Sequence, residues 1–115
     1  MNEDVSAPPV FGYVRAATAH RRRVERWRTR IASYCGHEGM ALELVFADVD
    51  VASTQLVRPA WTALLDVLAL REFHMVIVPS GDHLSCDPLL QADLRAQLAA
   101  AGAVVVAMPR AAVQP

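Results

Sequence analysis

The sequence predicts a three-layer α/β domain, in which helices cover both faces of a parallel sheet of four or five strands. Short apolar runs alternate with segments of helical periodicity, in the order β-α-β-α-β-α-β. Right-handed crossovers between such strands make the sheet parallel and put helices on both faces. A length of 115 residues fits one domain with a buried core. We expect a lead over residues 1–9, the domain over 10–109 and a tail over 110–115.

The first strand and the first helix follow directly from this pattern. Residues 10–14 are mostly apolar and form the first expected strand. Thr18 is a fair N-cap, and a helix is predicted over residues 19–37, ended by Gly36 and Gly39. The apolar residues that recur at helical spacing are Val24, Trp27, Ile31, Tyr34 and Cys35.

The second strand is predicted over residues 41–46, where Glu43 stands between two leucines. A charge in that position indicates that one face of the strand is partly exposed to solvent, which is typical of an edge strand. Residues 48–57 follow neither period and predict a loop. A helix over residues 59–71 comes next, because Pro59 suits a first turn and apolar residues follow at i, i+3, i+4 and i+7. These are Trp61, Leu64, Leu65 and Leu68.

The third strand, residues 75–78, is apolar throughout, as expected for a central strand covered on both faces. It should therefore lie beside the first strand, in the middle of the sheet. Ligands of such sheets bind beyond the carboxyl ends of the strands, where the strand order reverses. Those ends lead into residues 15–18 and 79–86, so we expect any functional site there.

The third helix is predicted to begin at Asp87, an N-cap, and Pro88, at the first helical position, and to run to Ala101. Gly102 ends it, and the apolar residues 103–107 form the last strand, at the other edge of the sheet. Exposed apolar edges are paired or covered in soluble proteins. We therefore expect a homodimer or a complex with a protein partner. The apolar residues inside the helix are Leu90, Leu94 and Leu98.

The composition argues against several classes of protein. With 54% hydrophobic and 20% charged residues, the chain is not disordered. Its apolar runs are too short to span a membrane, and residues 1–4 lack the order of a signal peptide. Cys35 and Cys86 are far apart in sequence, which favours a reducing cytoplasm over a disulfide framework. A net charge of -1 argues against non-specific coating of nucleic acid, so any DNA binding should be weak.

Basic residues gather at the start of the first helix. Residues 21–23 are all arginine, in a turn where the helix dipole is already positive, so these cations cost stability. Cations are unfavourable at the start of a helix, and an exception to that preference near the expected site indicates anion binding. An i, i+4 stripe opposite the Trp27 face continues from them, formed by Arg22, Arg26 and Arg30. A solvated helix face is the simpler interpretation of this stripe, and contact with a phosphate or a partner is the alternative.

The loop before the third helix holds Asp82, His83 and Cys86. One Cys and one His on one loop are too few ligands for a closed zinc site, so we expect no metal. A nucleophilic Cys86 with His83 as its base is an alternative, although no third orienting group is evident. Gly12 and Gly81 stand alone, without the spacing of a phosphate-binding glycine loop. We expect no cofactor.

Three motifs, in order along the chain, resemble those of the serine recombinases, the resolvases and invertases. Residues 11–18, Phe-Gly-Tyr-Val-Arg-Ala-Ala-Thr, resemble that family's first strand, Tyr-x-Arg-Val-Ser-Thr. Asp48, Ser53 and Arg58 with its following proline look like the second-strand aspartate, the mobile loop and the Arg-Pro of the next helix. Residues 82–87, Asp-His-Leu-Ser-Cys-Asp, are similar to the motif Asp-Arg-Leu-Ser/Gly-Arg-Asp. The resemblance covers nearly the whole chain and implies the strand order 2-1-3-4.

The resemblance implies a chemistry for which this chain lacks several groups. In the family, a serine hydroxyl attacks a DNA phosphodiester and forms a phosphoserine link, while arginines hold the phosphate. The serine position is Ala17 here, and the two arginine positions of the third motif are His83 and Cys86. The matching positions that keep the family's residue are Arg15, Asp48, Arg58 and Asp82.

The resemblance thus implies a catalytically inactive, resolvase-like domain that acts as a protein-interaction or regulatory module. Because few residues follow the last strand, we expect neither the family's long dimerisation helix nor its DNA-binding domain. One alternative is a small anion- or nucleotide-binding domain. Another is residual DNA recombination or strand cleavage within a larger assembly, with Thr18 or Cys86 as the nucleophile. The candidate anion-binding residues are Arg15, Arg21, Arg22, Arg26 and Arg58.

Overall fold

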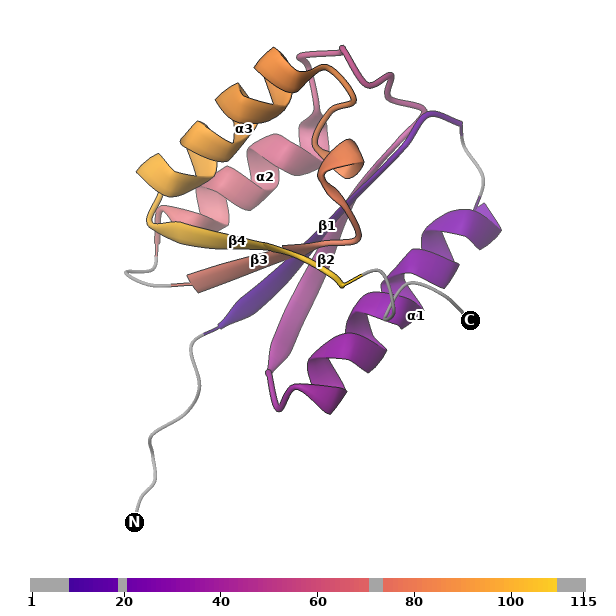
Figure 1. Cartoon of the computed structure of the whole chain (residues 1–115), viewed down its shortest axis with the longest axis vertical. Helices are drawn as coiled ribbons and strands as arrows, with labels where there is room; N and C mark the ends of the chain where they lie inside the picture. Colours follow the sequence, from indigo (N-terminus) through magenta and orange to yellow (C-terminus); the bar gives the residue numbers. More distant parts are fainter. Residues whose placement is uncertain (1–8, 19–20, 71–73, 110–115) are drawn as a thin grey trace.

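The computed structural model describes residues 9–18, 21–70 and 74–109, which form a parallel sheet with helices on both faces (Figure 1). The strand order is β2-β1-β3-β4, so the predicted fold class and strand order are confirmed, with four strands in the described residues. The strands are β1 (Val10–Ala16), β2 (Leu42–Val49), β3 (His74–Val78) and β4 (Ala103–Ala107). The helices are α1 (Arg21–His37), α2 (Pro59–Leu68) and α3 (Pro88–Ala100), and a short 3-10 turn spans Gly81–His83. Most of the predicted lead and the whole predicted tail lie outside the described residues.

Two strands extend further than the sequence predicts. β1 and β2 pair in register as far as Ala16 and Val49, so backbone hydrogen bonds carry both strands past the end of their apolar pattern. Asp48 consequently lies in a strand, and its prediction as a loop residue is wrong. The predicted end of the second helix at Arg71 is also wrong, because the chain tightens after Leu68 into an i, i+3 turn. The Thr18 cap remains untested, since residues 19 and 20 lie outside the described part.

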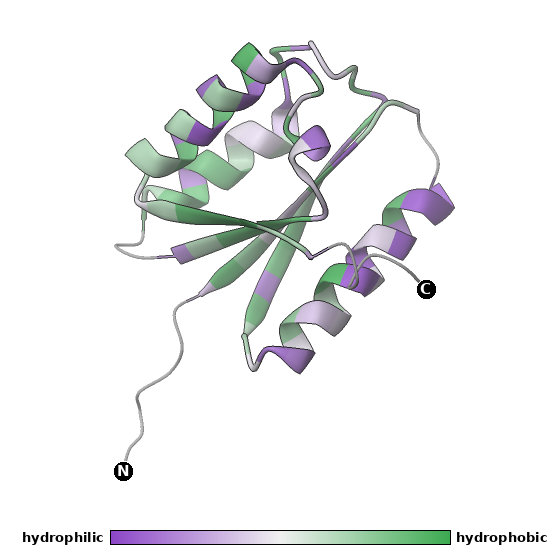
Figure 2. Ribbon diagram, in the orientation of Figure 1, coloured by the Kyte–Doolittle hydropathy of each residue, from purple (hydrophilic) through white to green (hydrophobic). Residues whose placement is uncertain are grey.

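Two apolar clusters lie on opposite faces of the sheet. α2 and α3 cover one face, where Tyr13, Trp61 and Leu98 are buried. α1 covers the other face over β1 and β2, and its residue Ile31 packs there with Val14. The strands are mostly hydrophobic through the middle of the molecule, whereas the helices mix hydrophobic and hydrophilic residues along their length (Figure 2). Both faces of the central strands are therefore buried, as their apolar sequences predict.

Gly12 allows α1 to lie close to β1. A Cβ atom at this position would lie 3.1 Å from Val45 Cγ2 and 3.3 Å from Ile31 Cδ1. Such contacts are tight for a packed interior, where small volume changes are felt. The isolated glycine of the sequence therefore has a packing role, because it leaves room beside β1 for Ile31 of α1 and Val45 of β2.

The cap of α2 comes from a neighbouring strand. Arg58, at the N-cap position, makes no side-chain cap hydrogen bond. Instead, Asp48 Oδ1 accepts from the Ala60 N–H at 2.8 Å, and Asp48 Oδ2 accepts from the Trp61 N–H at 2.9 Å. The Tyr13 hydroxyl also donates to Oδ2, at 2.8 Å. This carboxylate, 4% exposed, thereby joins β1, β2 and α2, and its charge is favourable at a helix N-terminus.

The cap of α3 is local, as predicted. The Asp87 carboxylate accepts from the Leu89 N–H at 3.0 Å, and Pro88 occupies the first turn. At the other end, Gly102 adopts a φ of 86° and turns the chain into β4. Neighbouring residues alone therefore determine where this helix begins and ends.

Replacing Asp48 should destabilise the fold strongly. Asp48→Ala leaves the Tyr13 hydroxyl and two N–H groups of α2 without their acceptor, so we expect the free energy of unfolding to fall by about 2–4 kcal/mol. Urea unfolding followed by circular dichroism measures this loss. Asp66→Ala, on the exposed side of α2, is the matched control and should change stability by no more than about 0.5 kcal/mol. Equal losses in the two variants would contradict the role of Asp48.

Candidate functional site

A cleft opens beside the carboxyl end of β1, where the sequence analysis expects a site. Its volume is about 310 Å³, and its walls come from β1, α1 and the 3-10 turn. Ala17 lies exposed in this cleft, together with Arg15 and His83. Arg23 belongs to the arginine turn in which the sequence indicates anion binding, whereas Trp27 is expected only as an apolar residue of the helix and not as a wall of the cleft. Their i, i+4 spacing is the signal that could have placed both on one side of α1.

Arg15 borders the cleft, but backbone carbonyls hold its guanidinium. Nη1 donates to Val51 O at 3.1 Å, and Nη2 donates to Asp82 O at 2.8 Å. The third nitrogen, Nε, is buried without a hydrogen-bond partner among the described residues. Arg15 therefore ties the end of β1 to the loops that follow β2 and β3. An anion in the cleft would compete with two carbonyl oxygens for this side chain.

His83 is a neutral wall of the cleft. Its ring packs edge-to-face on Trp27, with ring centroids 5.0 Å apart. Nδ1 accepts the backbone N–H of Arg15 at 3.2 Å, which requires this nitrogen to be unprotonated. Burial and then the charge of Arg15 lower the pKa of His83 from 6.5 to about 4, against a small opposing effect of Asp82. At neutral pH the ring therefore offers no positive charge to the cleft.

Hydrogen bonds tie the loop that carries Cys86 to the loop after β2. Ser53 Oγ accepts the Cys86 N–H at 2.6 Å. Ser85 Oγ donates to Ser53 O at 2.9 Å and accepts the Asp87 N–H at 3.0 Å. The hydroxyl of Ser85 is therefore buried and already used in holding the two loops together.

The geometry does not support a Cys86–His83 catalytic pair. Cys86 is exposed, and no hydrogen bond joins it to His83 in the part of the chain described. The ring nitrogen of His83 that could accept a thiol proton already accepts the Arg15 amide. Cys35, the other free cysteine, is buried in the core, and burial raises the pKa of its thiol.

Arg58 lies beneath the loop of residues 51–57, with only 1% of its surface exposed. Nε donates to Gln55 O and Nη2 donates to Ser53 O, each at 2.8 Å. Nη1 is buried and has no hydrogen-bond partner in the described residues. Burial and the adjacent Asp48 raise the pKa of Tyr13 well above its usual value, although the charge of Arg58 partly opposes them. Arg58 therefore serves the interior, and an anion could reach it only after this loop moved.

The arginines of the predicted turn and stripe of α1, among which Arg28 is not counted, have three different environments. Arg23 borders the cleft, whereas the Arg30 guanidinium lies over the ring of Trp27, 5.3 Å from its centroid. The prediction that Arg30 lies opposite the Trp27 face is wrong, because residues three positions apart are neighbours on a helix surface. The solvent-exposed members of the predicted anion-binding set are Arg21, Arg22 and Arg26.

The described residues carry neither a metal-binding cluster nor a membrane-spanning helix. In the described ranges, no three His, Cys, Asp or Glu side chains gather as a metal ion would require. No helix there has the length and apolar character needed to cross a bilayer. Asp82, His83 and Cys86 therefore do not belong to a cluster of metal ligands among the described residues.

Acid should destabilise the protein through His83. The pKa of about 4 in the folded state lies below 6.5, so the unfolded chain binds more protons between these values. The free energy of unfolding should be highest above pH 6.5 and fall toward pH 4, by up to about 1.4 kcal/mol per pH unit from this group. Urea unfolding at a series of pH values measures the slope. His83→Gln should flatten it and His37→Gln, at the exposed end of α1, should not; an unchanged slope in His83→Gln would refute the assignment.

Comparisons with known proteins agree with this geometry. The family model "Resolvase, N terminal domain" matches residues 10–112. No curated protein sequence matches the chain significantly. Three solved structures superpose well on the fold. The N-terminal catalytic domain of TP901-1 integrase gives a TM-score of 0.77 at 19% identity, over 86% of this chain and 76% of that chain.

The other two structures are both of recombinases. A resolvase family site-specific recombinase from Streptococcus pneumoniae gives a TM-score of 0.72 at 10% identity, over 88% of this chain and 72% of that chain. The C-terminal catalytic domain of ISC1926 TnpA, an IS607-like serine recombinase, gives 0.71 at 16% identity, over 86% and 68%. At such identities the structures show a shared fold, and the family model covers nearly all of the sequence. The chain belongs to the resolvase N-terminal domain family.

Proposed function

We propose that this resolvase-family domain does not cleave or join DNA itself and acts as a protein-interaction or regulatory module. The observation that carries the proposal is Ala17, which lies exposed in the cleft and which the motif resemblance assigns to the position of the family's serine. A methyl group cannot attack a phosphodiester, and covalent catalysis needs an activated nucleophile at that point.

The charges around the cleft support the same proposal. Phosphoryl transfer depends on fixed positive charge around the phosphate oxygens. The third motif supplies a neutral His83 and a cysteine, Cys86, in place of two arginines. The two retained arginines, Arg15 and Arg58, already donate to backbone carbonyls. The site therefore lacks the attacking group, and both arginines that it keeps from the family's motifs are already hydrogen-bonded.

Residual strand cleavage by another nucleophile is the first alternative. Thr18 is exposed next to Ala17, and Cys86 is exposed on the neighbouring loop. Neither has a side-chain base among the hydrogen bonds of the described residues. DNA cleavage that Thr18→Ala or Cys86→Ser abolished would support this alternative over an inactive domain.

Anion binding is the second alternative, and the cleft itself favours it. Arg15 and Arg23 border a hollow of about 310 Å³, with Trp27 as an aromatic wall. These two arginines, rather than the enclosed Arg58, would face a phosphate group. A calorimetric titration with inorganic phosphate, compared between wild type and Arg23→Ala, distinguishes such a site from a surface that binds only protein.

Restoring the hydroxyl alone, with Ala17→Ser, should not give a covalent DNA adduct. The attacking oxygen would return, but two guanidinium groups would still be missing from the phosphate. Each preorganised donor is worth on the order of 3–4 kcal/mol, so their absence costs several powers of ten in rate. A nicked suicide substrate with a labelled 5′ end, run on denaturing gels beside an active serine recombinase, detects the adduct. An adduct from the wild type or from Ala17→Ser would disprove the inactive assignment.

DNA binding should be weak and independent of sequence. The exposed arginines of α1 can touch phosphates, but the net charge of the whole chain is -1. Affinity should therefore fall steeply as salt rises, as counterion release requires. Fluorescence anisotropy with two unrelated duplexes over a salt series measures both properties. Tight binding to one duplex at physiological salt would contradict this expectation.

A further inference from the structure

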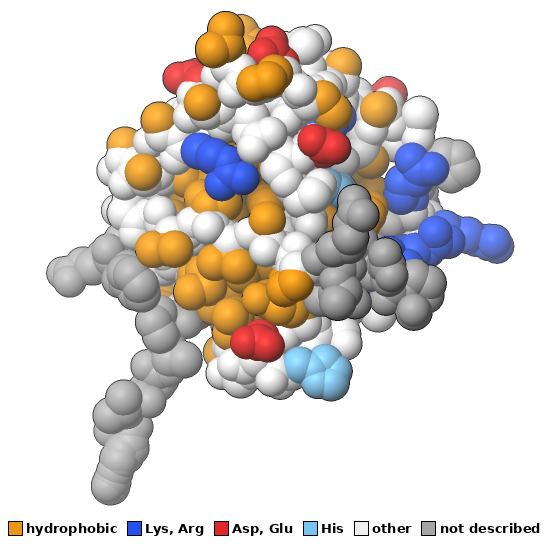
Figure 3. Space-filling view, in the orientation of Figure 1, with side chains coloured by type: hydrophobic (Ala, Val, Ile, Leu, Met, Phe, Trp, Pro, Cys, Tyr) orange, Lys and Arg blue, Asp and Glu red, His pale blue; other side chains and the backbone are white. Residues whose placement is uncertain are grey.

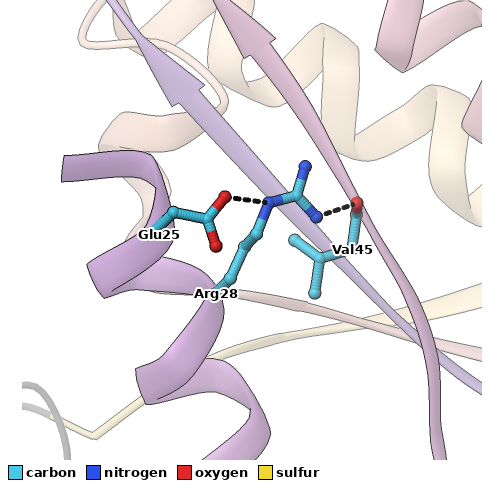
Figure 4. Close-up of polar contacts among 3 residues, drawn as sticks. All are labelled: Glu25, Arg28 and Val45. Atoms are coloured by element: carbon cyan, nitrogen blue, oxygen red, sulfur yellow. Dashed lines mark hydrogen bonds and ion pairs between the residues drawn. The ribbon is translucent and has the colours of Figure 1, made fainter. Parts of the chain in front are cut away.

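The two edges of the sheet differ in their protection. At the β2 edge, Arg28 of α1 donates from Nη1 to Val45 O at 2.8 Å, while its Nε lies 3.6 Å from Glu25 Oε2 (Figure 4). A charged side chain bonded to a strand carbonyl opposes pairing with another chain. At the other edge, β4 pairs with β3, and no side chain of the described residues is seen to bond to its outer backbone.

The outward backbone groups of β4 follow from one hydrogen bond. Met108 donates its N–H to Val78 O at 2.9 Å, so the N–H of Met108 points toward β3. Backbone groups alternate between the two edges of a strand, residue by residue. The N–H and C=O groups of Ala103, Val105 and Ala107 therefore point away from β3, toward the open edge.

The sequence of β4 is self-complementary. Its five residues, Ala-Val-Val-Val-Ala, read the same in both directions. If two copies pair antiparallel about Val105, then Val105 lies opposite Val105, and Ala103 lies opposite Ala107 of the second copy. These are hydrogen-bonded pairs, so every outward N–H meets an outward C=O. Such pairing is isologous, since one two-fold axis relates the two strands.

The side chains of β4 also fit this pairing. Val106 packs in the cluster on the α1 side of the sheet, and Val104, two residues away, shares that face and is 47% exposed. Hydrophobic side chains gather beside β4 in this part of the surface (Figure 3). Antiparallel pairing places Val104 opposite Val106 of the second copy, as an apolar cross-strand pair. No charged residue lies between Arg95 and Arg110, so no like charges from this segment meet across the axis.

We propose that the outer edge of β4 is a self-association surface, at which two copies of this chain pair antiparallel through residues 103–107. The sheet then continues from one copy into the other. This inference goes beyond the proposed function, because it specifies a second copy as the partner and does not depend on whether DNA is cleaved. In this proposal the β4 edge pairs with a second copy, whereas the hydrogen bond from Arg28 to Val45 O opposes such pairing at the β2 edge.

The first test measures the mass of the full chain, without DNA, by sedimentation equilibrium from low to high micromolar concentration. We expect a monomer–dimer equilibrium in the wild type. Val104→Lys should raise the dissociation constant about tenfold or more, because a desolvated ammonium replaces the valine pair. Val49→Lys is the matched control, since Val49 is 44% exposed and lies on β2, at the edge where Arg28 bonds to the backbone. A monomer at every concentration, or equal weakening by both variants, would refute the proposal.

The second test needs no variant and so does not depend on the folding of Val104→Lys. Amide hydrogen exchange, measured by NMR at low and high protein concentration, reports directly on the backbone of β4. The amides of Val105 and Ala107 should exchange more slowly at high concentration. A dimer in which these two amides exchange at unchanged rates would overturn the assignment to β4. Either result leaves the DNA-cleavage assay of the proposed function unaffected.

Discussion

A buried carboxylate, that of Asp48, determines how the loops around the cleft are arranged. A buried charge is tolerated only where hydrogen bonds replace its water. Here three donors do so, the Tyr13 hydroxyl and the first N–H groups of α2. Because β1, β2 and α2 all meet at this group, the chain between β2 and α2 must fold back over the end of the sheet. That return places Ser53 against Ser85 and encloses Arg58.

The enclosed loops give the retained polar residues a structural role. Arg15 and Arg58 each donate twice to backbone carbonyls, which satisfies loop groups that no helix or strand can pair. The same guanidinium groups would have to leave these carbonyls before binding a phosphate. His83 completes the arrangement as a neutral ring between Trp27 and the Arg15 amide. A fold held together in this way suits the proposed interaction module, which does not depend on cations in the cleft.

The arrangement of helices explains where a partner can bind. α2 and α3 bury one face of the sheet, whereas α1 packs on β1 and β2 of the other face and bonds to the β2 edge through Arg28. On the α1 side of β4, Val104 is consequently 47% exposed. A parallel α/β sheet normally has both faces covered, so a protein surface packed on Val104 would bury apolar area that α1 leaves open.

The sequence by itself determined the features that depend on neighbouring residues. Periodicity located the α-helices and strands of the described residues but not the 3-10 turn. Glu43 indicated the β2 edge, and Asp87 with Pro88 fixed the start of α3, because each of these signals acts within a turn or a strand. Only the tertiary structure decided that Asp48 caps α2 and that His83 is neutral. Those contacts join residues that are 13 and 68 positions apart. The order of apolar and polar residues within one helix or strand carries no information about which distant groups pair or which become buried.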